Sequence, residues 1–255
     1  MAGPDWFLTR PPGPAPAARI FCFAHAGGSP RMFLDWQRHL AGDAEIVAVC
    51  PPGRGPRASE PQPSLPGLIE GAAAAIAASA EHDQRHLYLF GHSLGGLVAF
   101  EVARRLRDLP ALRHLVASGI SAPSLLPSAR VRELATLRGR DFAEGLRFFG
   151  ALPAEVFADE GVLDMLLPGL MADFRMAAEY RYQPAQPLAI DVSLIVGRDD
   201  PHVGPAQLEG WRDECVAAPA IHWADGGHVY FDGRPSAVTD LLRGVVGADQ
   251  HVEMI

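Results

Sequence analysis

A serine placed between two glycines is the residue best suited to act as a nucleophile. The stretch Gly91-His92-Ser93-Leu94-Gly95 fits the G-x-S-x-G elbow, in which a serine occupies a sharp turn between a strand and a helix. Such a turn strains the backbone and presses the positions two before and two after the serine against neighbouring backbone, so only glycine fits there. The apolar run 86–90 predicts the strand, and 94–106 predicts the helix. An ordinary strand-to-helix turn is the alternative for the pentapeptide alone.

A serine hydroxyl is a weak nucleophile at neutral pH, so it needs a histidine to accept its proton and an acid to orient that histidine. In α/β hydrolases these residues follow in the order serine, acid, histidine. Two aspartates, Asp199 and Asp200, follow the predicted strand 190–196 after a glycine and an arginine. We expect Asp200 to be the acid, because its spacing from Gly197 and the following Pro201 place it beyond the turn, and Asp199 is the alternative.

His228 is the expected base among the ten histidines of the chain. It follows two glycines in the loop after the last predicted strand, 220–223, where a flexible backbone lets the ring reach back to Ser93. The sequence therefore predicts the catalytic triad Ser93, Asp200 and His228.

Four other histidines compete with it. His222 lies inside the strand pattern and is interpreted as structural, and His202 is too near Asp200 in sequence to form a separate arm. His25 and His92 flank the expected site, and we interpret them as residues that shape it.

The negative oxygen formed when a serine attacks a carbonyl needs two backbone N–H donors. Leu94, directly after the nucleophile at a helix N-terminus, is one expected donor. The other is Ala26, in the glycine-rich loop 25–29 that follows an early strand, where α/β hydrolases hold half of the oxyanion hole. Side chains do not matter for this role, so only geometry can test it.

Strand and helix patterns alternate along the chain, which predicts an α/β protein with a mostly parallel central sheet and helices on both faces. Between about 123 and 186 helical patterns dominate, interrupted at Pro153 and Pro168. We expect this segment to be a helical lid inserted into a single α/β-hydrolase domain, residues 1–255. The alternative is that these are ordinary helices that cover the core.

Composition excludes several other classes of protein. A net charge of −8 argues against nucleic acid as a partner. No apolar run is long enough to span a membrane and no signal peptide begins the chain, so we expect a cytoplasmic protein without a membrane partner. The three cysteines are far apart, which favours buried free thiols. We find no metal-ligand cluster and no phosphate loop, and the glycine-rich loop lacks G-x-G-x-x-G spacing, so we expect no cofactor.

Several motifs together resemble the type II thioesterases that accompany polyketide synthases and nonribosomal peptide synthetases. They are Phe23-Ala24-His25-Ala26-Gly27-Gly28, Pro52-Gly53-Arg54 with Arg57, Phe90-Gly91-His92-Ser93-Leu94-Gly95-Gly96, Leu97-Val98-Ala99-Phe100-Glu101, Ser118-Gly119 followed by Ala122-Pro123, Gly197-Arg198-Asp199-Asp200-Pro201 and Gly226-Gly227-His228. The resemblance runs from about Phe21 to Phe231. Leu94 and Gly96 depart from the methionine and alanine that are frequent there, and the loop 51–57 is richer in proline and glycine than in the family.

The resemblance implies that the protein hydrolyses acyl groups from the phosphopantetheine arm of acyl or peptidyl carrier proteins and so removes stalled or misprimed intermediates. The lid would then admit the arm, and its phenylalanines and methionines would line an acyl chamber or form core. Four arginines near the lid are candidates for a carrier-protein patch, or else form a solvated surface: Arg130, Arg132, Arg138 and Arg140. We expect a monomer. The alternative functions are a carboxylesterase, lipase or acyltransferase on the same fold, or a binding module without catalysis.

Overall fold

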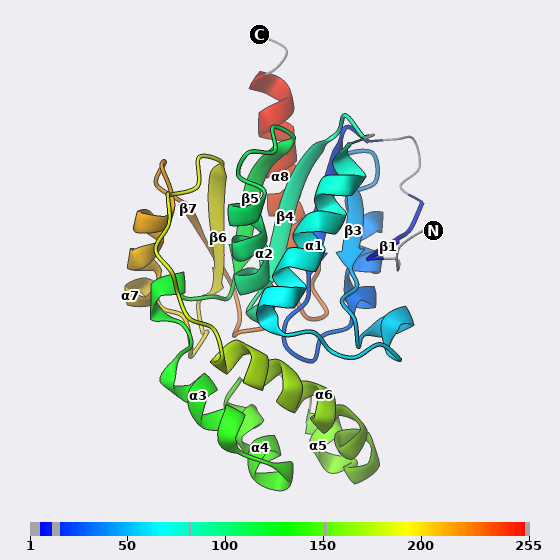
Figure 1. Ribbon diagram of the computed structural model, residues 1–255, viewed down its shortest axis with the longest axis vertical. Coiled ribbons are helices and arrows are strands. Elements are labelled where there is room, and N and C mark those ends of the chain that lie inside the picture. Colours follow the sequence, from blue (N-terminus) through cyan, green and yellow to red (C-terminus); the bar gives the residue numbers. More distant parts are fainter. Residues whose placement is uncertain (1–5, 12–15, 82, 150–151, 153, 253–255) are drawn as a thin grey trace.

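The computed structural model describes residues 6–11, 16–81, 83–149, 152 and 154–252. At its centre lies a seven-stranded sheet in the order β1-β3-β2-β4-β5-β6-β7 (Figure 1). The strands are β1 Phe7–Thr9, β2 Ala18–Phe23, β3 Glu45–Val49, β4 His86–His92, β5 Leu112–Ser118, β6 Asp191–Gly197 and β7 Ala220–Ala224. Neighbouring strands from β2 onwards run parallel, and β1 pairs antiparallel with β3. The predicted α/β class with a mostly parallel sheet is confirmed.

Helices connect the strands and cover both faces of the sheet (Figure 1). With η denoting a 3-10 helix, they are η1 Pro30–Arg38, η2 Gly55–Arg57, α1 Leu65–Ala80, α2 Leu94–Arg105, η3 Pro123–Leu125, α3 Ala129–Thr136, α4 Gly139–Leu146, η4 Arg147–Phe149, α5 Ala154–Ala158, α6 Glu160–Ala178, α7 Pro205–Leu208, η5 Glu209–Glu214 and α8 Ser236–Val252. The apolar residues of α1 and α2 pack on one face of the sheet, and those of η1 and α8 pack on the other.

Alternate residues of the central strands point to opposite faces of the sheet, as the period of two in a strand requires. In β4, Leu87 and Leu89 join the apolar cluster beneath α1 and α2. Tyr88 and Phe90 join the cluster beneath η1 and α8. Because both faces are buried, the strand has an unbroken apolar run instead of alternating polar and apolar residues.

Strand β1 is a feature that the sequence does not predict. It is three residues long, and it lies in a segment rich in proline and arginine. Pairing with the edge of β3 holds it in place, and the Cys50 N–H donates to the carbonyl of Trp6 at 2.7 Å. The Trp6 ring packs against α1 at Gly71, where a Cβ atom would collide with it. Tertiary packing therefore forms this strand, and local propensity does not.

The segment between β5 and β6 has an apolar cluster of its own. Its helices α3 to α6 lie together at one end of the sheet, in green below it in Figure 1. The buried members of this cluster are Leu134, Phe142, Ala143, Leu146, Phe149, Leu167, Leu170 and Phe174. Because this cluster is separate from the two on the sheet faces, the placement favours a lid over ordinary core-covering helices. Its limits at about 123–186 and the single-domain division stay predictions.

The predicted break at Pro168 is wrong, because α6 runs through it without interruption. Proline removes one helical hydrogen bond and crowds the carbonyl four residues earlier, which here belongs to Asp164. Both Pro168 and Asp164 are exposed, so water can satisfy that carbonyl and the ring has space. The other predicted break, Pro153, lies outside the described residues.

Candidate active site

Ser93 occupies the turn between β4 and α2 in a strained backbone conformation. Its φ of 54° and ψ of −119° make it the one non-glycine residue with positive φ in the described parts of the chain. Such a conformation costs on the order of 1–3 kcal/mol and persists only where the surroundings enforce it. The Ser93 N–H donates to the carbonyl of Ser118 at 2.8 Å, which holds the turn against the end of β5.

The two glycines of the elbow have no space for a side chain. A Cβ on Gly91 would collide with the carbonyl of Gly95, and a Cβ on Gly95 would collide with the carbonyls of Phe23 and Ala24 at the end of β2. All of these obstacles are backbone atoms, which cannot turn aside as a flexible side chain would. The steric requirement that the sequence implies is therefore present in the structure.

The loops after β6 and β7 bring an aspartate and a histidine together. His228 Nδ1 lies 2.8 Å from Asp200 Oδ2, and the side chain of Asp200 is fully buried. The backbone N–H of Asp199 donates to the carbonyl of Gly226 at 3.0 Å, so hydrogen bonding joins the two loops. Asp199 itself is exposed, and the aspartate that contacts His228 is Asp200.

The environment keeps Asp200 ionised. Burial by itself would raise the pKa of its carboxyl, but the hydrogen bond and charge of His228 and the His202 N–H, at 2.8 Å from Oδ1, outweigh burial and hold the pKa below its usual value. A buried carboxylate on Nδ1 fixes the ring of His228 and leaves Nε2 to face the pocket.

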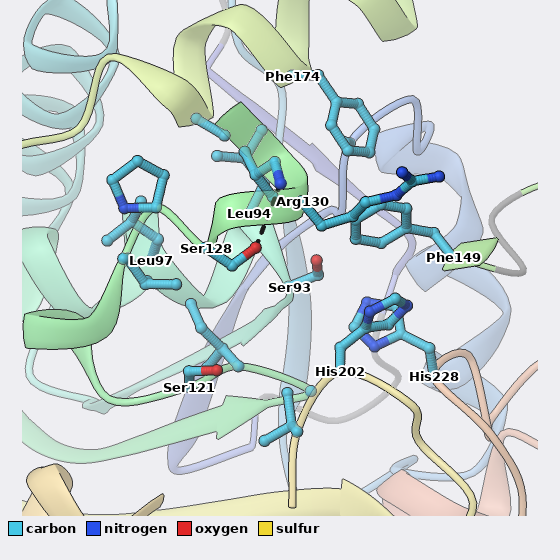
Figure 2. A pocket seen from close by; sticks show the side chains of 18 of the residues that line it. Ser93, Leu94, Leu97, Ser121, Ser128, Arg130, Phe149, Phe174, His202 and His228 are labelled. Atoms are coloured by element: carbon cyan, nitrogen blue, oxygen red, sulfur yellow. Dashed lines mark hydrogen bonds between the residues drawn. The ribbon is translucent and has the colours of Figure 1, made fainter. Parts of the chain in front are cut away.

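Ser93 and His228 line the same cavity, whose volume is about 330 Å³. Figure 2 shows the Ser93 hydroxyl directed into it, on the side where the rings of His228 and His202 lie. Ala26 and Leu94 line it too, so the residues whose N–H groups the sequence nominates as oxyanion donors border the nucleophile. The structure thus brings together all five residues that the sequence selects.

Neither His92 nor His25 is among the residues that line this cavity, and their rings pack against each other with centroids 5.9 Å apart. The His92 ring is fully buried, 4.9 Å from the ring of His228, and its Nδ1 lies 2.8 Å from the Ser118 hydroxyl, which also contacts Tyr230 at 2.7 Å. Burial, and then the charges of His228 and His25, hold the pKa of His92 well below its usual value. This second serine–histidine contact is closed to substrate, because Ser118 is fully buried within the sheet.

His202 is a pocket residue that sequence reasoning missed. Its ring stacks on Phe149 with centroids 4.2 Å apart and lies 5.0 Å from the ring of His228 (Figure 2). The signal available in the sequence is its position two residues after the acid, in a loop at the carboxyl edge of the sheet. Its closeness to Asp200 in sequence argues against His202 as the triad histidine, but it does not prevent contact between His202 and His228.

The lid contributes fewer aromatic side chains to the pocket than its composition suggests. Phe149 and Phe174 line the cavity with Leu126, whereas Phe142 is fully buried among the lid helices. Met165 is 71% exposed at the surface. Most of the large apolar residues of the lid therefore form its own core.

Two of the four arginines near the lid are paired with carboxylates. Arg130 lies 2.7 Å from Glu133, and Arg140 lies 2.6 Å from Glu160. Arg138 donates to backbone carbonyls of its own segment. These pairs reduce the positive potential that the bare sequence suggests.

Within the described residues no group of histidine, cysteine, aspartate and glutamate is arranged to hold a metal ion. None of the described helices combines the length and the apolar character needed to cross a membrane. The three cysteines are buried free thiols.

Comparison with known proteins finds similar chains and structures among thioesterases. A family model described as "Thioesterase domain" matches residues 18–245. Linear gramicidin dehydrogenase LgrE of Brevibacillus parabrevis is 34% identical over 244 residues, covering 93% of this chain and 90% of that protein. The structure of the type II thioesterase BorB from the borrelidin biosynthetic cluster has a TM-score of 0.83 at 28% identity, with coverage of 96% and 99%. RedJ, a thioesterase from the prodiginine pathway of Streptomyces coelicolor, gives 0.81 at 32% identity, with coverage of 92% and 88%.

These likenesses confirm both the α/β-hydrolase fold and the resemblance to type II thioesterases that the sequence motifs indicate. They extend over nearly the whole chain, so they include the elbow, the acid loop and the histidine loop.

The packing at the elbow predicts a large loss of stability for Gly95→Ala. The added methyl must displace backbone of β2, and we expect the free energy of unfolding to fall by about 3 kcal/mol. The matched control is Gly244→Ala in α8, where a Cβ meets no atom within 4 Å and should stabilise by about 0.5–1 kcal/mol. Urea denaturation measures both, and equal stability of the two variants would contradict the steric account.

The lowered pKa of Asp200 predicts a pH-dependent stability. Because the pKa is lower in the folded protein than the value of about 3.9 in an unfolded chain, the carboxylate stabilises the fold above that value, and this contribution is lost as pH falls through the folded pKa. Asp200→Asn should therefore be less stable than the wild type near neutral pH, with a difference that shrinks below about pH 4. A difference that stays constant with pH in urea titrations would contradict it.

Proposed function

The chain belongs to the thioesterase domain family and is a thioester hydrolase, and we propose that it removes acyl groups from the phosphopantetheine arm of acyl or peptidyl carrier proteins. In polyketide or nonribosomal peptide synthesis this activity clears stalled or misprimed intermediates. The observation that carries the proposal is that the strained Ser93 lines one pocket with His228, whose ring is bonded to the buried carboxylate of Asp200.

In the first half-reaction the Ser93 oxygen attacks the thioester carbonyl carbon while Nε2 of His228 accepts the hydroxyl proton. The carbonyl oxygen becomes negative, and the N–H groups of Ala26 and Leu94 donate to it. The carbon–sulfur bond then breaks, and the proton on His228 passes to the departing thiolate. The acyl group is now an ester of Ser93, and the pantetheine thiol is free.

In the second half-reaction water attacks the ester carbonyl as His228 takes one of its protons. The carbon–oxygen bond to Ser93 breaks, and His228 returns the proton to the serine oxygen. A carboxylic acid leaves, and the enzyme is restored. Throughout, Asp200 orients the ring and stabilises the imidazolium form without taking its proton.

The lining of the pocket supports an acyl substrate. Apolar side chains from α2, from the loop after β5 and from the lid surround the space beyond Ser93, among them Leu97, Ile120 and Phe174. Burial of an alkyl chain there is favourable by about 0.8 kcal/mol per methylene group. The carrier-bound form of the substrate is supported by the biosynthetic pathways named for BorB and RedJ.

The alternative functions use the same nucleophile on other substrates. A carboxylesterase, lipase or acyltransferase would need the same triad, and fold alone does not separate them from a thioesterase. One relative is named a dehydrogenase, but the glycine-rich loop after β2 lacks the spacing of a dinucleotide site. The choice therefore depends on a direct comparison of substrates.

The proposed mechanism predicts that Ser93→Ala lowers kcat for an acyl-carrier thioester by about 10⁴-fold or more, because it removes the elbow hydroxyl that forms the ester intermediate. Ser124→Ala, at an exposed serine of η3, is the matched control and should keep wild-type turnover. Release of free carrier thiol, followed by mass spectrometry, measures both variants. Unchanged hydrolysis by Ser93→Ala would contradict the mechanism.

The same assay separates the candidate functions when an oxygen ester with an identical acyl group is compared with the carrier thioester. We expect kcat/KM to be higher for the carrier thioester. Turnover of the simple ester without turnover of the carrier substrate would favour a carboxylesterase.

A further inference from the structure

The proline- and glycine-rich loop after β3 has no part in the triad, yet it contacts the lid directly. The guanidinium of Arg54 donates to Asp173 Oδ2 at 2.5 Å and to the carbonyl of Gly169 at 3.1 Å. Gln62, further along the same connection, donates to Asp173 Oδ1 at 2.7 Å. Gly169 and Asp173 both belong to α6, so this loop binds the lid helix mainly through one carboxylate.

That carboxylate also binds the loop after β2. The backbone N–H of Gly27 donates to Asp173 Oδ2 with an N–O distance of 2.7 Å. The side chain of Asp173 is only 9% exposed, and an unpaired carboxylate at such a site would be very costly. Hydrogen bonds to an ionised acceptor are also shorter and stronger than those between neutral groups. The bond therefore fixes the peptide between Ala26 and Gly27 more firmly than a neutral acceptor would.

The backbone of this loop leaves little other freedom. The Gly28 N–H donates to the carbonyl of His25 at 2.9 Å, which closes a four-residue turn, and Gly27 has a φ of 75°, as the third position of a type II turn requires. A Cβ on Gly27 would collide with the side chain of Leu170, one turn before Asp173 on α6. The lid helix thus contacts this turn twice, once by packing and once by a charged hydrogen bond.

We propose that Asp173 is a positioning residue for the oxyanion hole. By holding the Gly27 N–H from the lid helix, it keeps the adjacent Ala26 N–H directed at the point where the negative oxygen forms. This inference rests on the proposed function, since it requires an oxyanion at Ser93. It follows that the hole is complete only while α6 is docked on the loop after β2, so the lid sets catalytic geometry as well as covering the pocket.

The test is the kinetics of Asp173→Ala and Asp173→Asn with an acyl-pantetheine thioester. A misdirected N–H donor stabilises the transition state less but leaves substrate binding almost unchanged. We therefore expect kcat to fall by about 10²-fold in Asp173→Ala while KM changes little. Asp173→Asn keeps the volume and one acceptor oxygen, and should lose about tenfold. The carbonyl stretch of the acyl-enzyme, measured by infrared difference spectroscopy, should move to higher frequency in both variants, because the carbonyl accepts weaker hydrogen bonds.

Glu45→Gln is the matched control. Glu45 is the first residue of β3, at the amino end of the strand, whereas the site lies at the carboxyl ends of the strands. Like Asp173 it is a largely buried carboxylate paired with arginine: its side chain is 12% exposed and lies 3.1 Å from Arg19 and 3.0 Å from Arg85. Its loss should lower stability while leaving kcat and the carbonyl frequency unchanged.

Wild-type kcat in Asp173→Asn, a rise in KM at constant kcat, or an unchanged carbonyl frequency would overturn the proposal. If Asp173→Ala does not fold, Asp173→Asn decides alone. Full turnover by Ser93→Ala would instead refute the proposed function, so the two failures are distinguishable.

Discussion

The close approach of the elbow to the end of β2 is the contact on which the rest of the site depends. It leaves no room for a side chain at Gly95 and supports the unusual backbone angles of Ser93. Because the chain continues from the end of β2 directly into the turn that contains Ala26, the same contact places the nucleophile and the proposed oxyanion loop relative to each other. This link is made of backbone atoms in a close-packed sheet edge, so its geometry depends little on side-chain rotamers.

The acid and the base are positioned by a second backbone link. A parallel sheet brings the carboxyl ends of its strands to one edge, and there the loops after β6 and β7 are joined by the hydrogen bond from Asp199 to Gly226. The buried carboxylate of Asp200 then needs only one further contact, to His228, to orient the imidazole. Over this edge the lid supplies apolar walls and, through the carboxylate of Asp173, a hydrogen bond from the backbone N–H of Gly27 in the loop after β2. The sheet edge thus positions Ser93, Asp200 and His228, and the helical segment docked on it completes the pocket.

Much of this arrangement follows from the sequence, because steric and topological rules act at fixed spacings. Gly91 and Gly95 mark the elbow because a backbone obstacle allows nothing larger, and strands β4, β6 and β7 follow from the short runs 86–90, 190–196 and 220–223. The order of serine, acid and histidine selects a serine and a histidine that line one pocket and an aspartate bonded to that histidine, and their catalytic roles stay predictions. Asp173 could not be found this way. It lies 146 residues from Gly27 in sequence, on a helix where an aspartate is ordinarily a solvated surface residue. Strand β1 and the uninterrupted α6 likewise depend on tertiary contacts that local patterns do not contain.

The central claim is that the acyl group passes through an ester of Ser93. It is tested most directly by mixing the enzyme with an acyl-pantetheine thioester, quenching with acid during the first turnover and mapping the peptides by mass spectrometry. The account predicts that the mass of the acyl group appears on the peptide that contains Ser93 and on no other, and that it disappears as substrate is exhausted. Thioester hydrolysis with no acyl group on Ser93, or with the group on a different residue, would contradict it.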